Sequence, residues 1–278
     1  MNKNYPKIVR GSNLAGKIIF VDGLAGCGKT MFSSIISSLN NVEIMNYSFE
    51  IEFLCRLNSI NKLSEDAAIS MVKNLTDFRL YENMMGRNVN FRYSDLSSVF
   101  NTNNPLRYFK RIFQKGDSAI PKEIKIRRPI LNLTTHDLLQ VGKPVFLGLE
   151  DRIAFIDVIR HPLLMIIQQT LNMENIINNS RDINIYFEHK GKELPFFALG
   201  WEDLFLKSNP VEKAIYYMKY ENENREKFKS ENLNLISGRI LTIPFENFVK
   251  HPEIYMKKLL ILIDSKYTKK TKKTLIKQ

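Results

Sequence analysis

Residues 17–30 read KIIFVDGLAGCGKT, an apolar run of strand length that leads straight into the pattern G-x-x-x-x-G-K-T. Residues 31–39 follow with apolar side chains at helical spacing. A strand before this pattern and a helix after it are the setting in which it forms a phosphate-binding loop, the P-loop. We therefore expect the rest of the chain to form an α/β fold around this loop.

Each residue type in the loop has a chemical reason to be there. Gly23, Gly26 and Gly28 can adopt positive φ and let backbone N–H groups converge on a phosphate, and the following helix adds its positive end. Lys29 supplies a mobile charge for outer phosphate or sulfate oxygens, and the hydroxyl of Thr30 is placed for a magnesium ion where one is used. The predicted nucleotide-binding segment comprises Gly23, Gly26, Cys27, Gly28, Lys29, Thr30 and Met31.

The composition is that of a globular protein with a basic surface. The 278 residues include 41 Lys and Arg against 29 Asp and Glu, which gives a formal net charge of +12. This excess favours an anionic ligand or surface as a partner. Six lysines lie between positions 266 and 277, so we expect residues 266–278 to form a solvated, frayed tail and residues 1–265 to form one domain.

The cysteines and the N-terminus favour a cytoplasmic protein. Cys27 and Cys55 are the two cysteines, too few for a disulfide framework and without zinc-site spacing. Cys27 is expected to be a small filler at the start of a helix. Residues 1–16 are polar and basic without the apolar core of a signal peptide, and no window has the length of a membrane span.

Apolar patterning predicts a three-layer α/β fold with a mostly parallel central sheet flanked by helices. The expected strands cover residues 17–22, 42–45, 130–134, 153–159 and 240–245. The expected helices cover residues 29–39, 49–60, 64–85, 163–178, 211–229 and 252–263. Residues 144–147 are expected to be a short extended piece, and residues 183–187 an added strand or hairpin.

Residues 86–128 differ from the rest, because Asn, Arg and Lys interleave there with aromatic residues and no period is sustained. Such a stretch in an α/β chain indicates an insertion. It either lies over the active-site edge and sets acceptor specificity or forms a basic, solvated flap. Nucleic-acid binding is disfavoured, since no recognisable RNA- or DNA-binding motif accompanies the basic residues.

Three later segments resemble the sulfotransferase branch of the P-loop fold. Residues 243–253, IPFENFVKHPE, resemble the late-strand signature of that branch, in which a Tyr/Phe-Glu-Asp/Asn-Leu/Phe segment precedes Pro-Glu at the last helix. Residues 134–136, Thr-Thr-His, resemble its Lys-Thr-His segment, and residues 158–162, Val-Ile-Arg-His-Pro, resemble its Arg-Asn/Asp-Pro strand end. Glu246 is expected to fix the loop after the last strand by hydrogen bonding.

The resemblance implies a donor, 3′-phosphoadenosine 5′-phosphosulfate, whose phosphosulfate is held by residues 23–30. It implies that Lys29 neutralises the bridging oxygen, that His136 is the general base, and that Arg160 grips the 3′-phosphate. Gln168 stands where the family commonly has a Ser that joins this Arg. The acceptor implied is a hydroxyl-bearing small molecule or carbohydrate, with an acidic sugar, a nucleotide and a lipid head group left open.

Two other functions remain open from the sequence. The complete G-x-x-x-x-G-K-T loop also resembles that of nucleotide kinases, in which Thr30 and an acid such as Asp151 would hold the magnesium of ATP. Asp22 or Glu150 would then serve as the base. Asp157 is a further candidate for a magnesium ligand, with a structural role in its strand as the alternative. The third possibility is a nucleotide-binding module without catalysis.

Overall fold

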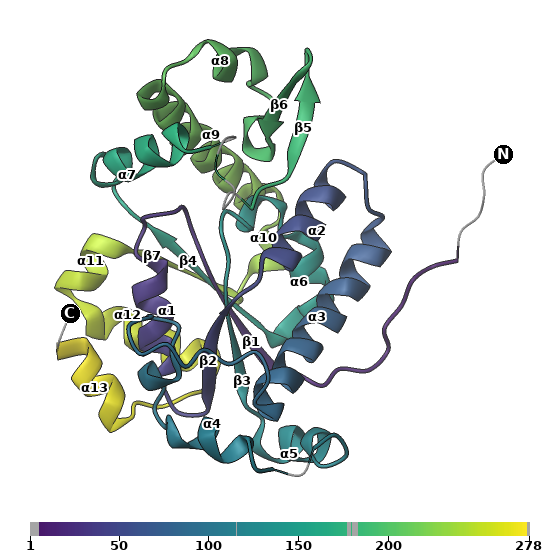
Figure 1. Ribbon diagram of the computed structural model, residues 1–278, viewed down its shortest axis with the longest axis vertical. Helices are drawn as coiled ribbons and strands as arrows, with labels where there is room; N and C mark the ends of the chain where they lie inside the picture. The colour runs from purple at the N-terminus through teal and green to yellow at the C-terminus, as the bar shows by residue number, and fades with distance from the viewer. Residues whose placement is uncertain (1–5, 115, 177–178, 180–182, 277–278) are drawn as a thin grey trace.

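Five parallel strands form the central sheet in a computed structural model, which describes residues 6–114, 116–176, 179 and 183–276 (Figure 1). The order across the sheet is β2-β3-β1-β4-β7, and β1 pairs in parallel with β3 on one side and β4 on the other. The strands are β1 (Lys17–Asp22), β2 (Val42–Tyr47), β3 (Ile130–Thr134), β4 (Ile153–Ile159) and β7 (Ile240–Pro244). The predicted α/β fold with a parallel sheet is confirmed, and the loop follows the carboxyl end of its central strand.

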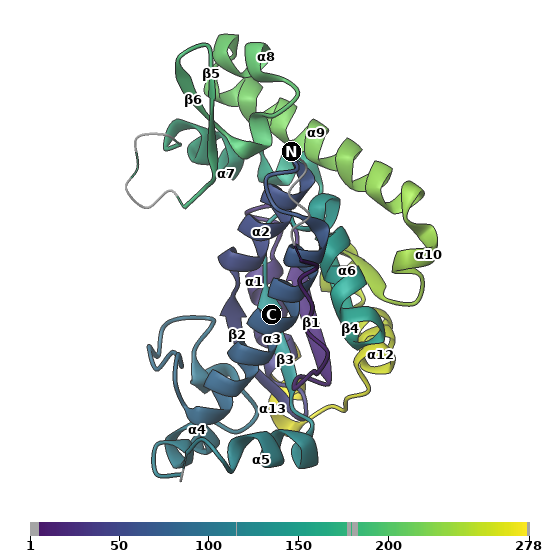
Figure 2. The same cartoon turned by 90° about the vertical axis from the view of Figure 1, so that its right-hand side faces the viewer.

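Helices cover both faces of this sheet, as Figures 1 and 2 show. One face carries α1 (Lys29–Ser37), α11 (Phe245–Lys250), α12 (Pro252–Ile263) and α13 (Lys269–Ile276). The other carries α2 (Phe49–Ser59), α3 (Glu65–Met85), α6 (Lys143–Leu149) and α10 (Leu233–Ile236). The 3₁₀ helices of the described residues are η1 (Val99–Asn101), η2 (Leu139–Val141), η3 (Glu150–Arg152) and η4 (Phe196–Ala198).

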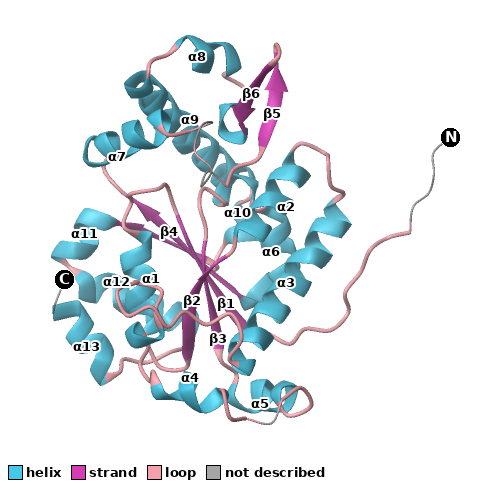
Figure 3. Ribbon diagram, in the orientation of Figure 1, coloured by secondary structure: helices cyan, strands magenta, loops and turns pink. Residues whose placement is uncertain are grey.

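A further group of elements lies beyond the carboxyl ends of the strands, at the top of Figure 3. It contains α7 (Pro162–Glu174), the antiparallel hairpin β5 (Tyr186–His189) and β6 (Lys192–Pro195), α8 (Glu202–Lys207) and α9 (Pro210–Glu231). The helices expected at 163–178 and 211–229 correspond to α7 and α9, while residues 177–178 lie outside the described residues. The strand or hairpin expected at 183–187 is the β5–β6 hairpin, displaced toward the C-terminus.

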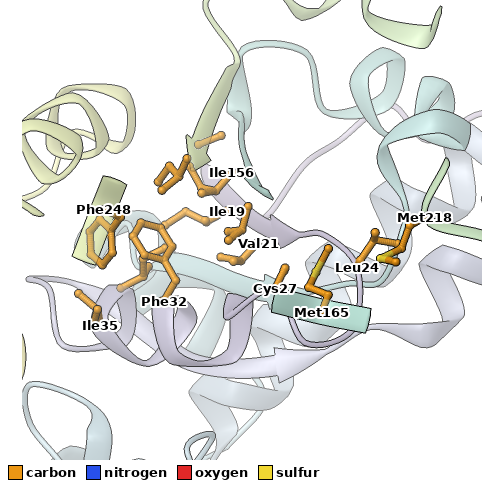
Figure 4. Close-up of a cluster of buried hydrophobic side chains, with 14 of the residues drawn as sticks. Ile19, Val21, Leu24, Cys27, Phe32, Ile35, Ile156, Met165, Met218 and Phe248 are labelled. Carbon is orange, nitrogen blue, oxygen red and sulfur yellow. The ribbon is translucent and has the colours of Figure 1, made fainter. Parts of the chain in front are cut away.

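Among the described residues, a large apolar core lies on each face of the sheet, and a smaller one joins β2 to the insertion. Alternate residues of a strand point to opposite faces, so Ile19 and Ile156 belong to the core beneath α1, and Phe20 and Phe155 to the core beneath α2, α3 and α6. The rings of Phe20 and Phe155 stack with centroids 6.1 Å apart. Figure 4 shows the first core, which continues from Phe248 to the underside of the loop. The sheet is thus held rigidly where it carries the loop.

Residues 144–147 were expected to be extended. In the structure they form part of α6 instead. A four-residue apolar run fits a buried helix as well as a strand. Pro144 lies in the first turn of α6, where its missing N–H costs no helical hydrogen bond. A Cβ atom on Gly148 would lie 3.3 Å from the carbonyl oxygen of Ile69 in α3, so the two helices pack closely.

The insertion at 86–128 packs along the β2 edge of the sheet. It contains η1, α4 (Leu106–Arg111) and α5 (Ile120–Arg127), and α4 and α5 lie near the amino ends of β2 and β3 (Figure 2). On α4, Tyr108 accepts a hydrogen bond from the backbone N–H of Ile44, and Arg107 donates one to the carbonyl oxygen of Val42. The α4 and α5 helices lie away from the active-site edge, so the expectation that they cover it is not met. Side chains from α4 cover an edge strand that would otherwise expose unpaired backbone groups, while Lys110, Arg127 and Arg128 are exposed.

The C-terminal segment is not the frayed tail that its lysines predicted. Residues 269–276 form α13, which packs against α1, and the hydroxyls of Thr268 and Thr271 both donate to the carbonyl oxygen of Ser38. Thr271 is fully buried. These two hydrogen bonds satisfy a carbonyl group at the carboxyl end of α1. They hold α13 in place despite the repulsion among its lysines. Residues 277–278 lie outside the described residues, and within the described part no helix is long and apolar enough to cross a membrane.

Candidate active site

The loop after β1 presents backbone rather than side chains to the space in front of α1. Gly23, Gly26 and Gly28 have φ values of 148°, 82° and 95°. A Cβ atom on Gly23 would lie 2.4 Å from the carbonyl oxygen of Val158, and one on Gly28 would lie 2.1 Å from the ring of Phe245. Both positions therefore require glycine, for conformation and for space.

Positive charge is concentrated in front of this loop. The helix α1 begins at Lys29, and the first N–H groups of a helix have no helical partner and carry its positive end. The Nζ atom of Lys29 donates to the carbonyl oxygen of Leu24 at 3.2 Å, so this buried ammonium group folds back over the loop. The hydroxyl of Thr30 lies 3.5 Å from that of Tyr47. The arrangement fits an anion such as phosphate or sulfate.

Arg160 and Gln168, the two residues that the resemblance assigns to a 3′-phosphate, both lie beside the loop. Arg160, just past β4, donates from Nη1 to the carbonyl oxygen of Gly26 at 2.9 Å, and its guanidinium lies 5.0 Å from the ring centre of Phe245. Its Nε atom is 3.5 Å from Oε1 of Glu246. Gln168 on α7 packs against Gly26, where a Cβ atom would lie 3.2 Å from its Cγ. Two potential donors to an anion therefore flank the loop on its α7 side.

His136 lies just past β3 and is oriented by a glutamate that the sequence analysis missed. Glu52 on α2 accepts from the backbone N–H of His136 at 2.9 Å with Oε1, and the same oxygen is 3.2 Å from Nδ1 of the ring. The imidazole also stacks on Phe49, with centroids 5.4 Å apart, and on Tyr47 at 6.0 Å. When Nδ1 carries the proton and donates to Glu52, Nε2 is left as an acceptor.

The electrostatics of this pair follow from burial. Removal from water lowers the pKa of His136 to about 4, and the charge of Lys29 acts in the same direction. Burial raises the pKa of Glu52 to about 8, against the opposing charge of Arg56. The imidazole is therefore neutral at pH 7 and able to accept a proton.

A cavity of about 290 Å³ adjoins His136 and reaches the loop at Ala25. Its lining combines amides with aromatic rings, including Gln169, Asn172, Asn175, Phe49, Phe197 and Tyr217. Gln169 donates to the carbonyl oxygen of Ala25 at 2.6 Å, so α7 ties the cavity to the loop. Within the described part of the chain, no residue of the 86–128 insertion lines this cavity.

The acids proposed for a kinase either lie far from the loop or are already engaged in buried hydrogen bonds. Glu150 and Asp151 lie in η3, immediately before β4, at the opposite edge of the sheet from the loop, and Asp151 accepts from Arg239 at 2.7 Å. Asp22 is fully buried and accepts from the hydroxyl of Thr135 at 2.8 Å and from the backbone of η2. Asp22 thus fixes the segment that carries His136, and its burial raises its pKa.

Three further residues have structural surroundings. Asp157 is fully buried in β4 and pairs with Arg225 at 3.2 Å and Lys229 at 2.9 Å, which favours the structural reading. Cys27 belongs to the core, and burial raises the pKa of its thiol, as suits a filler. Met31 packs partly buried against the same core. Among the described residues, no group of three or more His, Cys, Asp or Glu is placed to hold a metal.

Comparison with known proteins identifies the fold. No family model and no curated protein matches the chain. The sulfotransferase domain from the curacin biosynthetic pathway aligns with a TM-score of 0.50 at 13% identity, over 94% of this chain and 77% of that one. The chain has the sulfotransferase fold.

Two more solved structures align at lower scores. The sulfotransferase domain from the Synechococcus PCC 7002 olefin synthase has a TM-score of 0.46 at 11% identity, covering 97% of this chain and 80% of its own. A sulfotransferase from Mycobacterium tuberculosis H37Rv has a TM-score of 0.44 at 9% identity, covering 94% and 71%. Because all these identities are low, roles for individual residues of this chain rest on the site geometry.

Proposed function

We propose that this protein transfers a sulfuryl group from 3′-phosphoadenosine 5′-phosphosulfate to a hydroxyl acceptor. The observation that carries the proposal is the position of His136. Its Nδ1 lies 3.2 Å from Glu52, and its ring adjoins a cavity that reaches Ala25 of the loop. A shared cavity supports a role for His136 as a base beside a loop suited to an anionic donor. The sulfotransferase fold is consistent with this chemistry.

The residues around the loop fit the donor's three anionic groups. The backbone of residues 23–30 and Lys29 would hold the phosphosulfate, with Cys27, Thr30 and Met31 at the start of α1. Arg160 and Gln168 would hold the 3′-phosphate, because both lie against Gly26 and carry N–H donors. The donor supplies the sulfuryl group and a phosphate as leaving group.

His136 and Lys29 would carry the transfer itself. His136 accepts the hydroxyl proton of the acceptor at Nε2 while Glu52 holds Nδ1–H, and the developing imidazolium lies against the Glu52 carboxyl group. The acceptor oxygen forms a bond to sulfur as the bond from sulfur to the phosphate oxygen breaks. Lys29 stabilises the negative charge that remains on that phosphate oxygen. Positioning and charge stabilisation account for the rate, as in phosphoryl transfer.

Calorimetric titration with adenosine 3′,5′-bisphosphate tests the donor assignment. We expect the bisphosphate to bind without magnesium, and Arg160→Met to weaken it about tenfold to a hundredfold, the worth of a charge-assisted contact to phosphate. The same substitution should weaken the binding of adenosine 5′-monophosphate much less, since this nucleotide lacks the 3′-phosphate. Arg239→Met is the matched control, because it removes the same charge at the opposite edge of the sheet.

Transfer of ³⁵S-labelled sulfuryl to 4-nitrophenol or to a methyl glycoside tests the base. His136→Ala should lower the rate about 10²- to 10⁴-fold and leave bisphosphate binding unchanged. Tighter binding of ATP with magnesium than of the bisphosphate, or full transfer by His136→Ala, would overturn the proposal. Binding without transfer to any acceptor would favour the non-catalytic module.

A further inference from the structure

A second and larger cavity, of about 860 Å³, lies between α7, α9 and the carboxyl ends of β4 and β7. The helix α9 separates it from the cavity at His136: Tyr217 lines the His136 cavity and its neighbour Met218 lines the larger one. Most of the larger lining is apolar, including Leu24, Val158, Met165, Ile166, Ile215 and Met218. Figure 4 shows Leu24, Met165 and Met218 together at one end of the core. The size and lining are those of a small-molecule site.

A buried cation with unused donors lines the same cavity. Arg225 on α9 is 4% exposed, and its Nη1 lies 3.2 Å from Oδ1 of Asp157. Its Nε and Nη2 atoms are buried without a hydrogen-bond partner among the described residues. Lys229 lies 2.9 Å from the other oxygen of Asp157, so Asp157 already has a second cation. Unpaired buried donors cost free energy, and an anion beside them would remove that cost.

The mouth of the cavity combines apolar and basic side chains. Leu163 at the start of α7 is 75% exposed and Ile215 on α9 is 51% exposed, and both line the cavity. Lys219 and Arg160 also line it, and among the described residues Glu246 is its one carboxylate. Three cations and one acid give the lining a positive balance. An exposed apolar rim indicates that the occupant carries an apolar body as well as a charge.

We propose that this cavity binds an organic anion with an apolar body, such as a fatty carboxylate or an aromatic sulfonate. The acidic group accepts hydrogen bonds from Nε and Nη2 of Arg225, and the body packs against Met165, Met218 and Ile215. This site goes beyond the sulfuryl transfer proposed above. It borders the donor site at Leu24, Cys27 and Arg160, but the acidic group is held by Arg225 and not by the loop backbone, Lys29 or His136.

Fluorescence titration with 8-anilinonaphthalene-1-sulfonate tests the site on the full chain. We expect saturable binding of one probe per chain, displaced by dodecanoate. Arg225→Met should weaken the probe at least tenfold. Lys227→Met is the matched control, since Lys227 lies on the same helix, is exposed and does not line the cavity. It should change affinity less than twofold.

A second variant keeps the proposal testable if Arg225→Met fails to fold. Ile215→Trp narrows the mouth from a half-exposed position and leaves Arg225 intact, and it should also weaken the probe at least tenfold. Circular dichroism and bisphosphate titration verify that each variant is native. Absence of saturable binding, equal effects of Arg225→Met and Lys227→Met, or competitive displacement of the probe by adenosine 3′,5′-bisphosphate would each overturn the proposal, the last because the cavity would then be part of the donor site.

Discussion

Two buried glutamates, Glu43 on β2 and Glu52 on α2, differ sharply although they are equally hidden. Glu43 is 1% exposed and Glu52 is 2% exposed. Nevertheless the pKa of Glu43 is lowered to about 2, whereas the pKa of Glu52 is raised to about 8. Burial alone would raise both pKa values. The partners that each carboxyl group meets decide the direction.

Glu43 is paired almost completely. Burial raises its pKa, but Arg107 and Arg111 together with Tyr108 outweigh it. Arg111 binds it with two parallel hydrogen bonds of 2.8 and 2.9 Å, and the hydroxyl of Tyr108 donates at 2.8 Å. The two arginines and the tyrosine all come from α4. Glu43 therefore anchors the 86–128 insertion to the sheet.

Glu52 is paired only in part. Its nearest cation, Arg56, is 3.6 Å away, and its other contacts are with the backbone and ring of His136. The effect of burial on the pKa of Glu52 therefore exceeds that of its partners, and the pKa rises to about 8. An incompletely compensated acid beside a histidine and a cavity is typical of a functional site, while a fully compensated one is typical of a structural anchor.

The largest expected effect on stability comes from removing the charge of Glu43, which holds α4 to β2. Glu43→Gln leaves the buried guanidinium of Arg111 without its counter-charge, and removing one member of a buried pair costs about 3–5 kcal/mol. The free energy of unfolding should fall by that amount in urea denaturation followed by circular dichroism. Glu50→Gln is the control, because Glu50 pairs with Arg79 at the surface and should cost less than about 1 kcal/mol. Equal losses for the two variants would contradict the comparison.

The sequence predicted what a local pattern defines and missed what only the tertiary structure brings together. The strand at 17–22 was predicted to the residue, because a short apolar run bounded by a glycine defines it locally. Arg160 was expected in the binding crevice because it follows the carboxyl end of a strand, and Gln168 was named from the family resemblance. Glu52 was missed, since its role depends on a contact with a residue 84 positions away. The one feature of the sequence that points to Glu52 is that this carboxylate lies next to core residues of α2 such as Ile51.

The same limit explains the other errors. Six lysines predicted a frayed tail, but the two threonine hydroxyls that hold α13 on α1 meet a carbonyl group more than 200 positions away. The composition of the insertion likewise did not show which of its basic residues is paired: Arg111 is buried against an acid on β2. Charge counted along the chain does not show which charges are paired across the fold.

The next effect is a change in the pH dependence of stability. The raised pKa of Glu52 means that the folded state binds more protons than the unfolded state between about pH 4.5 and pH 8. Its contribution to stability is therefore lost as pH rises through that window. The lowered pKa of His136 acts with the opposite sign, below about pH 6.5. Between pH 6.5 and 8, Glu52 accounts for a loss of about 1–2 kcal/mol.

Glu52→Gln should remove that loss, because glutamine keeps an acceptor for the backbone of His136 and does not titrate. The measurement compares unfolding free energies of the variant and the wild type at pH 6.5 and pH 8. Buried Asp22 and Glu221, whose pKa values are also raised, contribute to both proteins and cancel in the difference. A constant difference between the two proteins across this range would show that Glu52 is ionised throughout, like Glu43.

The smallest effect concerns the hydroxyl of Tyr108, which links α4 to the edge strand β2. Tyr108 accepts from the N–H of Ile44 at 2.8 Å and donates to Glu43, so Tyr108→Phe leaves both groups with one partner fewer. The expected loss is about 1–2 kcal/mol, the cost of one unsatisfied buried donor plus a weakened charged acceptor. Amide hydrogen exchange at Ile44 should accelerate, because β2 is an edge strand and this N–H has lost its acceptor. Tyr81→Phe, whose hydroxyl bonds the exposed Asp117, should change little. Unchanged exchange at Ile44 in Tyr108→Phe would mean that the insertion protects β2 by covering it and not through this hydrogen bond.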